Sequence, residues 1–159
     1  MEKTPITKEG LEKLKEELNV VKKVERPNNI KDIEEARAHG DISENAEYNA
    51  AKEKQAFLEG RMNKLEEIIS SAEVIEVDEG PLERVVFGAT VEIDQVSNDD
   101  VDVSVYTLVG LNESDPFNDM ISVTSPLGAA LIGKKVGDII ELRAPGGRRS
   151  FEILNIRGT

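Results

Sequence analysis

The first part of the chain places hydrophobic residues at intervals of three and four, with Lys and Glu between them. These positions are Leu11, Leu14, Leu18 and Val21. The spacing predicts an amphipathic helix that begins near Thr7. Gly40 is free to adopt the positive φ that commonly follows a helix, so we expect the helix to end there.

Pro27 interrupts this pattern. Proline lacks an amide proton, and its ring presses on the carbonyl group four residues earlier in a helix. We therefore expect a kink or a short break at Pro27, with the helix resuming through Ile30, Ile33 and Ala36.

A second helix is expected to begin near residues 41–44 and to follow an unbroken heptad spacing. The heptad positions are Ala51, Gln55, Leu58, Met62, Leu65, Ile69 and Ala72. Because the two helices have similar lengths and a short connection, they should pair antiparallel as a protruding helical hairpin. The small residues Ala46 and Ala50 near the connection indicate either a slender tip or simply good helix formers.

From about Glu73 the hydrophobic positions change to short alternating runs separated by Gly and Pro. The runs expected to form strands are residues 84–93, 101–109, 120–123, 139–142 and 151–156. Ser125 followed by Pro126 indicates one short helix, with Ser125 as its N-cap.

These patterns predict a two-domain α+β chain. Residues 1–76 form an antiparallel coiled-coil hairpin, and residues 77–159 form a small α+β domain with an antiparallel sheet and one short helix.

Composition narrows the range of partners. The net charge is -12, and 33% of the residues are charged. Such a surface repels free nucleic acid, so another molecule would have to present any nucleic acid to this chain. The absence of Cys excludes disulfides and thiolate metal sites and suits a reducing cytoplasm. No apolar run approaches the roughly 20 residues that cross a bilayer, so we expect a cytoplasmic protein with no membrane partner.

The connection between the predicted helices carries two carboxylates, Asp41 and Glu44. An Asp at the N-cap with a Glu three residues later has the spacing of a capping box, which would make both acids structural. The same pair could contribute to a Mg²⁺ site, weakly by itself and well where phosphate or a partner's acids supply further ligands. Glu47 adds a third acid, which is more than capping requires.

Residues 39–48, with the sequence HGDISENAEY, resemble the signature of bacterial Gre transcript-cleavage factors, the GreA/GreB family. The resemblance continues through residues 50–53 and 57–61 and into the second half of the chain. There it includes VFGATV at 86–91, ISVTSPL at 121–127, LIGK at 131–134 and APGG at 144–147. These long, ordered motifs run from about Ile6 to Ile156, which is almost the whole chain.

The resemblance implies a transcription elongation factor that is not itself an enzyme. Its hairpin would enter the secondary channel of bacterial RNA polymerase. Asp41 and Glu44 would help to hold the second Mg²⁺ of the polymerase active site and to position the attacking water. The polymerase would then hydrolyse backtracked RNA and resume elongation.

The same resemblance implies how metal and nucleic acid are shared. The Mg²⁺ is held jointly with the polymerase, and the free chain binds none tightly. The implied partners are the polymerase elongation complex and, through it, the nascent RNA 3′ end and the template DNA. We expect the chain to be a monomer.

Further residues near the tip match family positions. Arg37 and Lys52 match basic positions that would touch RNA, although a solvated helix face explains them equally well. Lys52 is often Arg in the family, so the charge persists but bidentate phosphate contact is lost. Tyr48 either stacks near RNA or covers the thin seam, and His39 is expected to be a polar surface residue.

The second half resembles FKBP-like domains and would dock at the rim of the polymerase channel. The expected contacts are Thr124, Ser125 and Pro126. Two alternatives stay open. One is a prolyl isomerase or chaperone, whose pocket should be lined with aromatic residues that are scarce in this half. The other is a Gre-like inhibitor that binds the polymerase without promoting cleavage.

Overall fold

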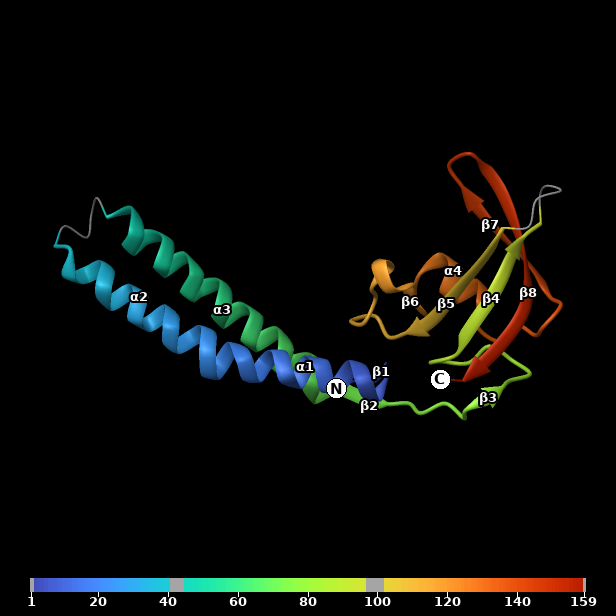
Figure 1. Cartoon of the computed structure of the whole chain (residues 1–159), viewed down its shortest axis with the longest axis horizontal. Coiled ribbons are helices and arrows are strands. Elements are labelled where there is room, and N and C mark those ends of the chain that lie inside the picture. Colours follow the sequence, from blue (N-terminus) through green and yellow to red (C-terminus); the bar gives the residue numbers. More distant parts are fainter. Residues whose placement is uncertain (1, 41–44, 97–101, 159) are drawn as a thin grey trace. The chain divides into compact units, whose positions relative to one another are not determined.

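The structure, a computed structural model, describes residues 2–40, 45–96 and 102–158. The chain divides into two compact units. The first contains Glu9–Ala72 and is helical, and the second contains Lys3–Lys8 and Glu73–Thr159 and is built on a sheet. The α+β fold class is therefore confirmed (Figure 1). Among the described helices, none combines the length and apolarity needed to cross a bilayer.

The helical unit is an antiparallel pair (Figure 1). Helix α1 (Lys8–Val20), a π-helical segment (Val21–Glu25) and α2 (Arg26–Ala38) follow one another and pair with α3 (Ala46–Ser71). The seam buries hydrophobic side chains from both partners. Its buried residues are Leu14, Val21, Ile33, Ala36, Ala51, Leu58, Leu65 and Ile68. Ala51, Leu58 and Leu65 are buried as the spacing predicted, but towards the end of α3 Ile68 is buried and the predicted Ile69 is only half-buried.

Two ion pairs link the paired helices. The guanidinium of Arg61 donates two hydrogen bonds of 2.8 Å to the carboxylate of Glu17. Lys22 lies 2.8 Å from Glu66. All four side chains are more than a third exposed, so these ion pairs add little to the stability of the hairpin.

Pro27 does not break the helix. The residues before it form the π-helical segment, in which the amide of Arg26 donates to the carbonyl of Val21, five residues earlier. The Pro27 ring would press on the Lys23 carbonyl in a regular α-helix, and Lys23 lies within this wider turn.

The π-helical segment adds one residue to the turn and rotates the helix that follows. Asn29, which is 1% exposed, therefore lies in the seam, whereas Ile30 is 43% exposed. The helix does resume through Ile30, Ile33 and Ala36 as expected, but of these three only Ile33 and Ala36 are buried.

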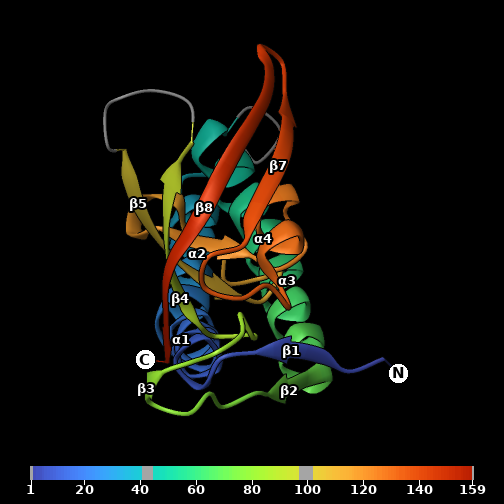
Figure 2. The same ribbon diagram turned by 90° about the vertical axis from the view of Figure 1, so that its right-hand side faces the viewer.

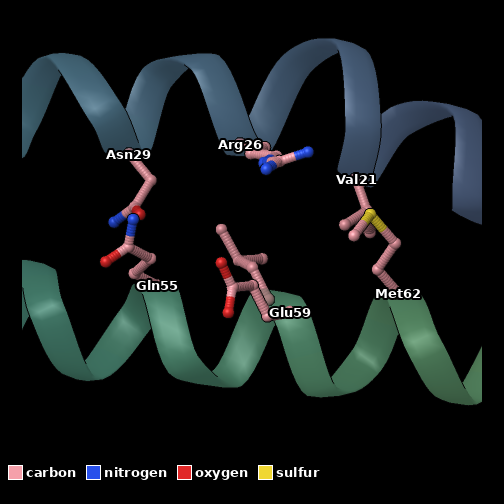
Figure 3. A pocket seen from close by; sticks show the side chains of 7 residues that line it. Val21, Arg26, Asn29, Gln55, Glu59 and Met62 are labelled. Carbon is pink, nitrogen blue, oxygen red and sulfur yellow. The ribbon is translucent and has the colours of Figure 1, made fainter.

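Asn29 borders a small cavity between the helices (Figure 3). Its Nδ2 donates to the carbonyl of Ala51 at 2.9 Å, but its Oδ1 has no hydrogen-bond partner among the described residues. Gln55 lies opposite on α3. A buried acceptor without a donor costs stability, so Asn29 makes the hairpin less stable at this level.

The second unit contains a six-stranded sheet (Figures 1 and 2). Its strands are β3 (Gly80–Pro81), β4 (Thr90–Gln95), β5 (Val103–Val109), β6 (Met120–Ser122), β7 (Ile139–Ala144) and β8 (Gly147–Gly158). The order is β3-β8-β4-β5-β6, and β7 pairs with β8. The expected antiparallel pairing is confirmed at every pair of this sheet except β5 with β6, which are parallel.

Two further elements differ from the expected strands. Strand β1 (Thr4–Ile6) pairs with β2 (Ala72–Val74), although residues 4–6 carried no strand signal. The expected strand over 84–93 begins only at Thr90, because a turn with Gly88 at φ +85° precedes it.

The short helix α4 (Pro126–Leu131) is confirmed as expected. Ser125 is its N-cap and accepts a hydrogen bond of 3.1 Å from the amide of Gly128. Leu131 is fully buried in the core with Ile93 and Ile153 of the sheet, so α4 covers one sheet face. This core, rather than aromatic packing, holds the unit together.

Candidate functional site

The candidate site is the connection between α2 and α3. The acids singled out from the sequence, Asp41 and Glu44, lie outside the described residues, which resume at Asn45. The structure does describe both helix ends that lead into the connection. Gly40 follows α2 with φ +105°, as expected for a residue that ends a helix.

Asn45 joins the two helix ends. Its Oδ1 accepts a hydrogen bond of 3.1 Å from the amide of Tyr48, which makes Asn45 the N-cap of α3. Its Nδ2 donates to the carbonyl of Ala36 in the last turn of α2 at 2.6 Å. One side chain therefore caps one helix and holds the end of the other.

This arrangement corrects the expected start of the second helix. Helix α3 begins at Ala46 rather than within residues 41–44, and its cap is Asn45. A capping box with Asp41 as the N-cap would require a helix that starts four residues earlier, so that interpretation does not apply to α3. Asn is a strong N-cap residue, but no Glu or Gln three residues later marked it in the sequence.

Two more contacts bridge the helix ends. His39 Nδ1 lies 3.2 Å from a carboxylate oxygen of Glu47, and both side chains are more than 60% exposed. The guanidinium of Arg37 lies 5.8 Å from the centre of the Tyr48 ring, within the range of a cation–π contact. His39 is thus a surface residue that pairs with Glu47, and Tyr48 is covered by Arg37.

Arg37 and Lys52, the residues expected to touch RNA, contact different neighbours. Arg37 is engaged with Tyr48, whereas exposed Lys52 donates from Nζ to Gln55 Oε1 at 2.8 Å within α3. Both basic groups belong to the hairpin end, but an RNA contact for either one stays a prediction.

A groove of about 410 Å³ lies between the helices close to the connection. Its lining residues are Asp32, Glu35, Ala36, His39, Glu47, Ala50, Ala51 and Lys54. Alanines take the places that larger side chains occupy elsewhere in the seam. Within the described residues, no group of three acidic or histidine side chains is placed to hold a metal ion.

The expected docking segment of the sheet unit has a structural role as well. Ser125 Oγ donates to the carbonyl of Ser122 at 2.6 Å while it caps α4. Thr124 and Pro126 are exposed, and the Thr124 hydroxyl lies 2.7 Å from that of Ser122. Only Thr124 and Pro126 therefore offer side chains that a partner can reach without disturbing the helix cap.

Comparisons with known proteins cover nearly the whole chain. A model of the N-terminal part of GreA/GreB transcription elongation factors matches residues 4–74, and a model of the C-terminal part matches residues 80–158. The chain is 50% identical over 157 residues to transcription elongation factor GreA of Rhodospirillum rubrum, which covers 99% of both chains. It is 52% identical over 157 residues to GreA of Anaeromyxobacter sp., with 98% of this chain and 93% of the relative covered.

A solved structure is also similar to the chain. The GreA factor homolog 1 (Gfh1) protein of Thermus thermophilus is 28% identical, with 98% of this chain and 99% of that chain covered and a TM-score of 0.43.

Proposed function

Because this chain belongs to the GreA/GreB family of transcription elongation factors, we propose that it stimulates RNA cleavage by RNA polymerase. The helical hairpin enters the secondary channel of a stalled elongation complex. The polymerase then hydrolyses the backtracked RNA, and the chain acts as its cofactor rather than as the enzyme. The two relatives named above are GreA proteins. The excess of acids over bases in the helical half also favours GreA over GreB.

One observation carries this proposal. The residues on either side of the connection are joined by the Asn45 bridge and by the His39–Glu47 and Arg37–Tyr48 contacts. These contacts hold the end of α2 against the start of α3. Since Asn45 already caps α3, capping by Asp41 is not needed to start that helix.

The donor set suits Mg²⁺ as a shared ligand. Mg²⁺ prefers oxygen ligands, is usually bound through one or two carboxylates, and keeps several waters. Asp41 and Glu44 supply two carboxylates, the number of protein ligands that Mg²⁺ usually takes. The pair therefore fits an ion whose other ligands come from a partner.

When bound, the Mg²⁺ would lower the pKa of a coordinated water and offset charge on the scissile phosphate. This chain contributes side chains that help to hold the ion and to orient the attacking water and the RNA. Asp41 and Glu44 hold the ion jointly with the polymerase and accept hydrogen bonds from the attacking water. Arg37 and Lys52 attract the RNA phosphates, and the Arg37 guanidinium lies over the Tyr48 ring at a cation–π distance.

The sheet unit supplies binding to the polymerase at the rim of the channel. Thr124, Ser125 and Pro126 form the contact, in which Thr124 and Pro126 present exposed side chains and Ser125 holds the segment by capping α4. Nucleic acid is reached only through the polymerase. The chain acts as a monomer in the cytoplasm.

The test is RNA cleavage in a stalled elongation complex. Asp41→Ala and Glu44→Ala should each abolish stimulated cleavage while the affinity for the polymerase changes by less than a few fold. Glu53→Ala removes an exposed acid from α3 and should behave like the wild type. Cleavage by either tip variant at the wild-type rate would refute the role of the acids. A wild-type chain that binds and leaves the RNA intact would show an inhibitor instead.

A further inference from the structure

Strands β7 and β8 continue beyond the rest of the sheet as a two-stranded ribbon (Figures 1 and 2). Strand β8 pairs with β4 only from Phe151 onward, whereas its pairing with β7 extends back to Gly147. Residues 141–150, in which Glu141 faces Ser150, therefore form a projection, which we call the arginine ribbon.

The arginine ribbon concentrates positive charge on an acidic chain. Residues 141–150 contain three arginines and one acid, Glu141, whereas the whole chain has a net charge of -12. These arginines are Arg143, Arg148 and Arg149, and all three are exposed. Arg143 and Arg148 are direct cross-strand partners.

The fold makes little use of these charges. Like charges that face one another across a strand pair destabilise it. Arg148 lies 3.9 Å from Glu141, but the two side chains are 66% and 63% exposed, so this pair contributes little. Within the described part of the chain, Arg143 and Arg149 form no ion pair. The cross-strand arginine pair near the end of the ribbon therefore destabilises it, and no strong ion pair within the described residues offsets that effect.

We propose that the arginine ribbon docks on a carboxylate-rich protein surface of the RNA polymerase. This proposal rests on the proposed function, and it adds a second contact to the one at Thr124–Pro126. A guanidinium forms paired hydrogen bonds with a carboxylate, and three of them on one ribbon match a cluster of Asp and Glu. A protein surface is favoured over nucleic acid because the remaining charge of the chain repels a continuous line of phosphates.

The experiment compares two full-length variants with the same change in net charge. Arg143→Gln, Arg148→Gln and Arg149→Gln together remove the ribbon charges. Arg84→Gln, Lys134→Gln and Lys135→Gln together remove three exposed basic residues elsewhere in the sheet unit. The affinity of each for the elongation complex is measured by competition with labelled wild-type chain, at low and at high KCl concentration.

The ribbon variant should bind about tenfold more weakly than the wild type at low salt, and the difference should shrink at high salt as the charges are screened. The matched variant should bind within about twofold of the wild type. At saturating concentration, the ribbon variant should stimulate cleavage at the wild-type rate, because the ribbon takes no part in the chemistry.

Four results would overturn the proposal. Unchanged affinity would show that the ribbon contacts nothing, and equal weakening of both variants would reflect net charge alone. A photo-crosslink from the ribbon to RNA would identify nucleic acid as the partner. A lower melting temperature of the free ribbon variant with unchanged affinity would show that the arginines pair within the chain. If the wild-type chain does not stimulate RNA cleavage, the proposed function is refuted instead. The competition experiment still tests whether the ribbon binds the polymerase.

Discussion

At the scale of single residues, two asparagines affect the hairpin in opposite ways. Asn45 has both ends of its amide satisfied, one on each helix. Asn29 is more deeply buried, yet its Oδ1 lacks a donor among the described residues. Neither role was predicted from the sequence. The burial of Asn29 and the Asn45–Ala36 bond depend on which residue of the other helix lies opposite, and no Glu or Gln three residues later marked Asn45 as a cap. The lone His39, by contrast, was expected at the surface and lies there.

Replacing Asn45 should loosen the end of the hairpin. Asn45→Ala removes both the cap of α3 and the bond to Ala36, so we expect a loss of about 1–2 kcal/mol in unfolding free energy of the hairpin. Asn45→Asp keeps the capping acceptor and loses only the donor to Ala36. Hydrogen exchange of the α3 amides should therefore accelerate more in Asn45→Ala than in Asn45→Asp. Equal protection in the wild type and both variants would contradict the role of Asn45.

Replacing Asn29 should have the opposite effect. In Asn29→Leu the unpaired Oδ1 disappears and the cavity is filled, while the Ala51 carbonyl retains its bond within α3. We expect the unfolding free energy to rise by about 1 kcal/mol, because a buried acceptor without a partner is removed. Urea denaturation measures this change. A clear destabilisation by Asn29→Leu would show that the Asn29 amide is fully satisfied in solution.

At the scale of elements, local chemistry decided which expectations were confirmed. Helix α4 begins where Ser125 and Pro126 indicate, because an N-cap and a proline in the first turn act within one turn of the chain. Pro27 correctly marked an irregularity, but whether the chain breaks or widens depends on packing against α3. The π-helical segment keeps the helix continuous and changes which residues face the seam.

The segment after β6 allows binding to be separated from stability. Pro126→Ala changes an exposed residue at the start of α4 and should weaken binding to the polymerase while leaving the melting temperature almost unchanged. Ser125→Ala removes the cap and the bond to Ser122, so it should also lower the stability of the sheet unit by about 1 kcal/mol. Thermal unfolding and a competition titration distinguish the two effects. If Pro126→Ala binds the polymerase as tightly as the wild type, the docking surface lies elsewhere.

At the scale of the whole molecule, the order of helices and strands was predictable and their long-range pairing was not. Strand β1 lies near the start of the chain but belongs to the sheet unit, and β5 and β6 pair in parallel across a ten-residue connection. Such pairings join residues that are distant in sequence. The carboxylate of Glu113, which accepts from the amide and hydroxyl of Thr7, is one example. The family was predictable because its motifs are read along the chain, and the comparisons confirmed it.

In the proposed function, the acids of the hairpin connection complete a Mg²⁺ site on the polymerase. The most direct measurement is the Mg²⁺ dependence of RNA cleavage in a stalled complex, with saturating wild-type chain, Asp41→Asn or Glu44→Gln. The wild-type chain should lower the Mg²⁺ concentration needed for half-maximal cleavage, and either neutral variant should lose that shift while still bound. A variant that keeps the wild-type Mg²⁺ dependence would contradict the claim.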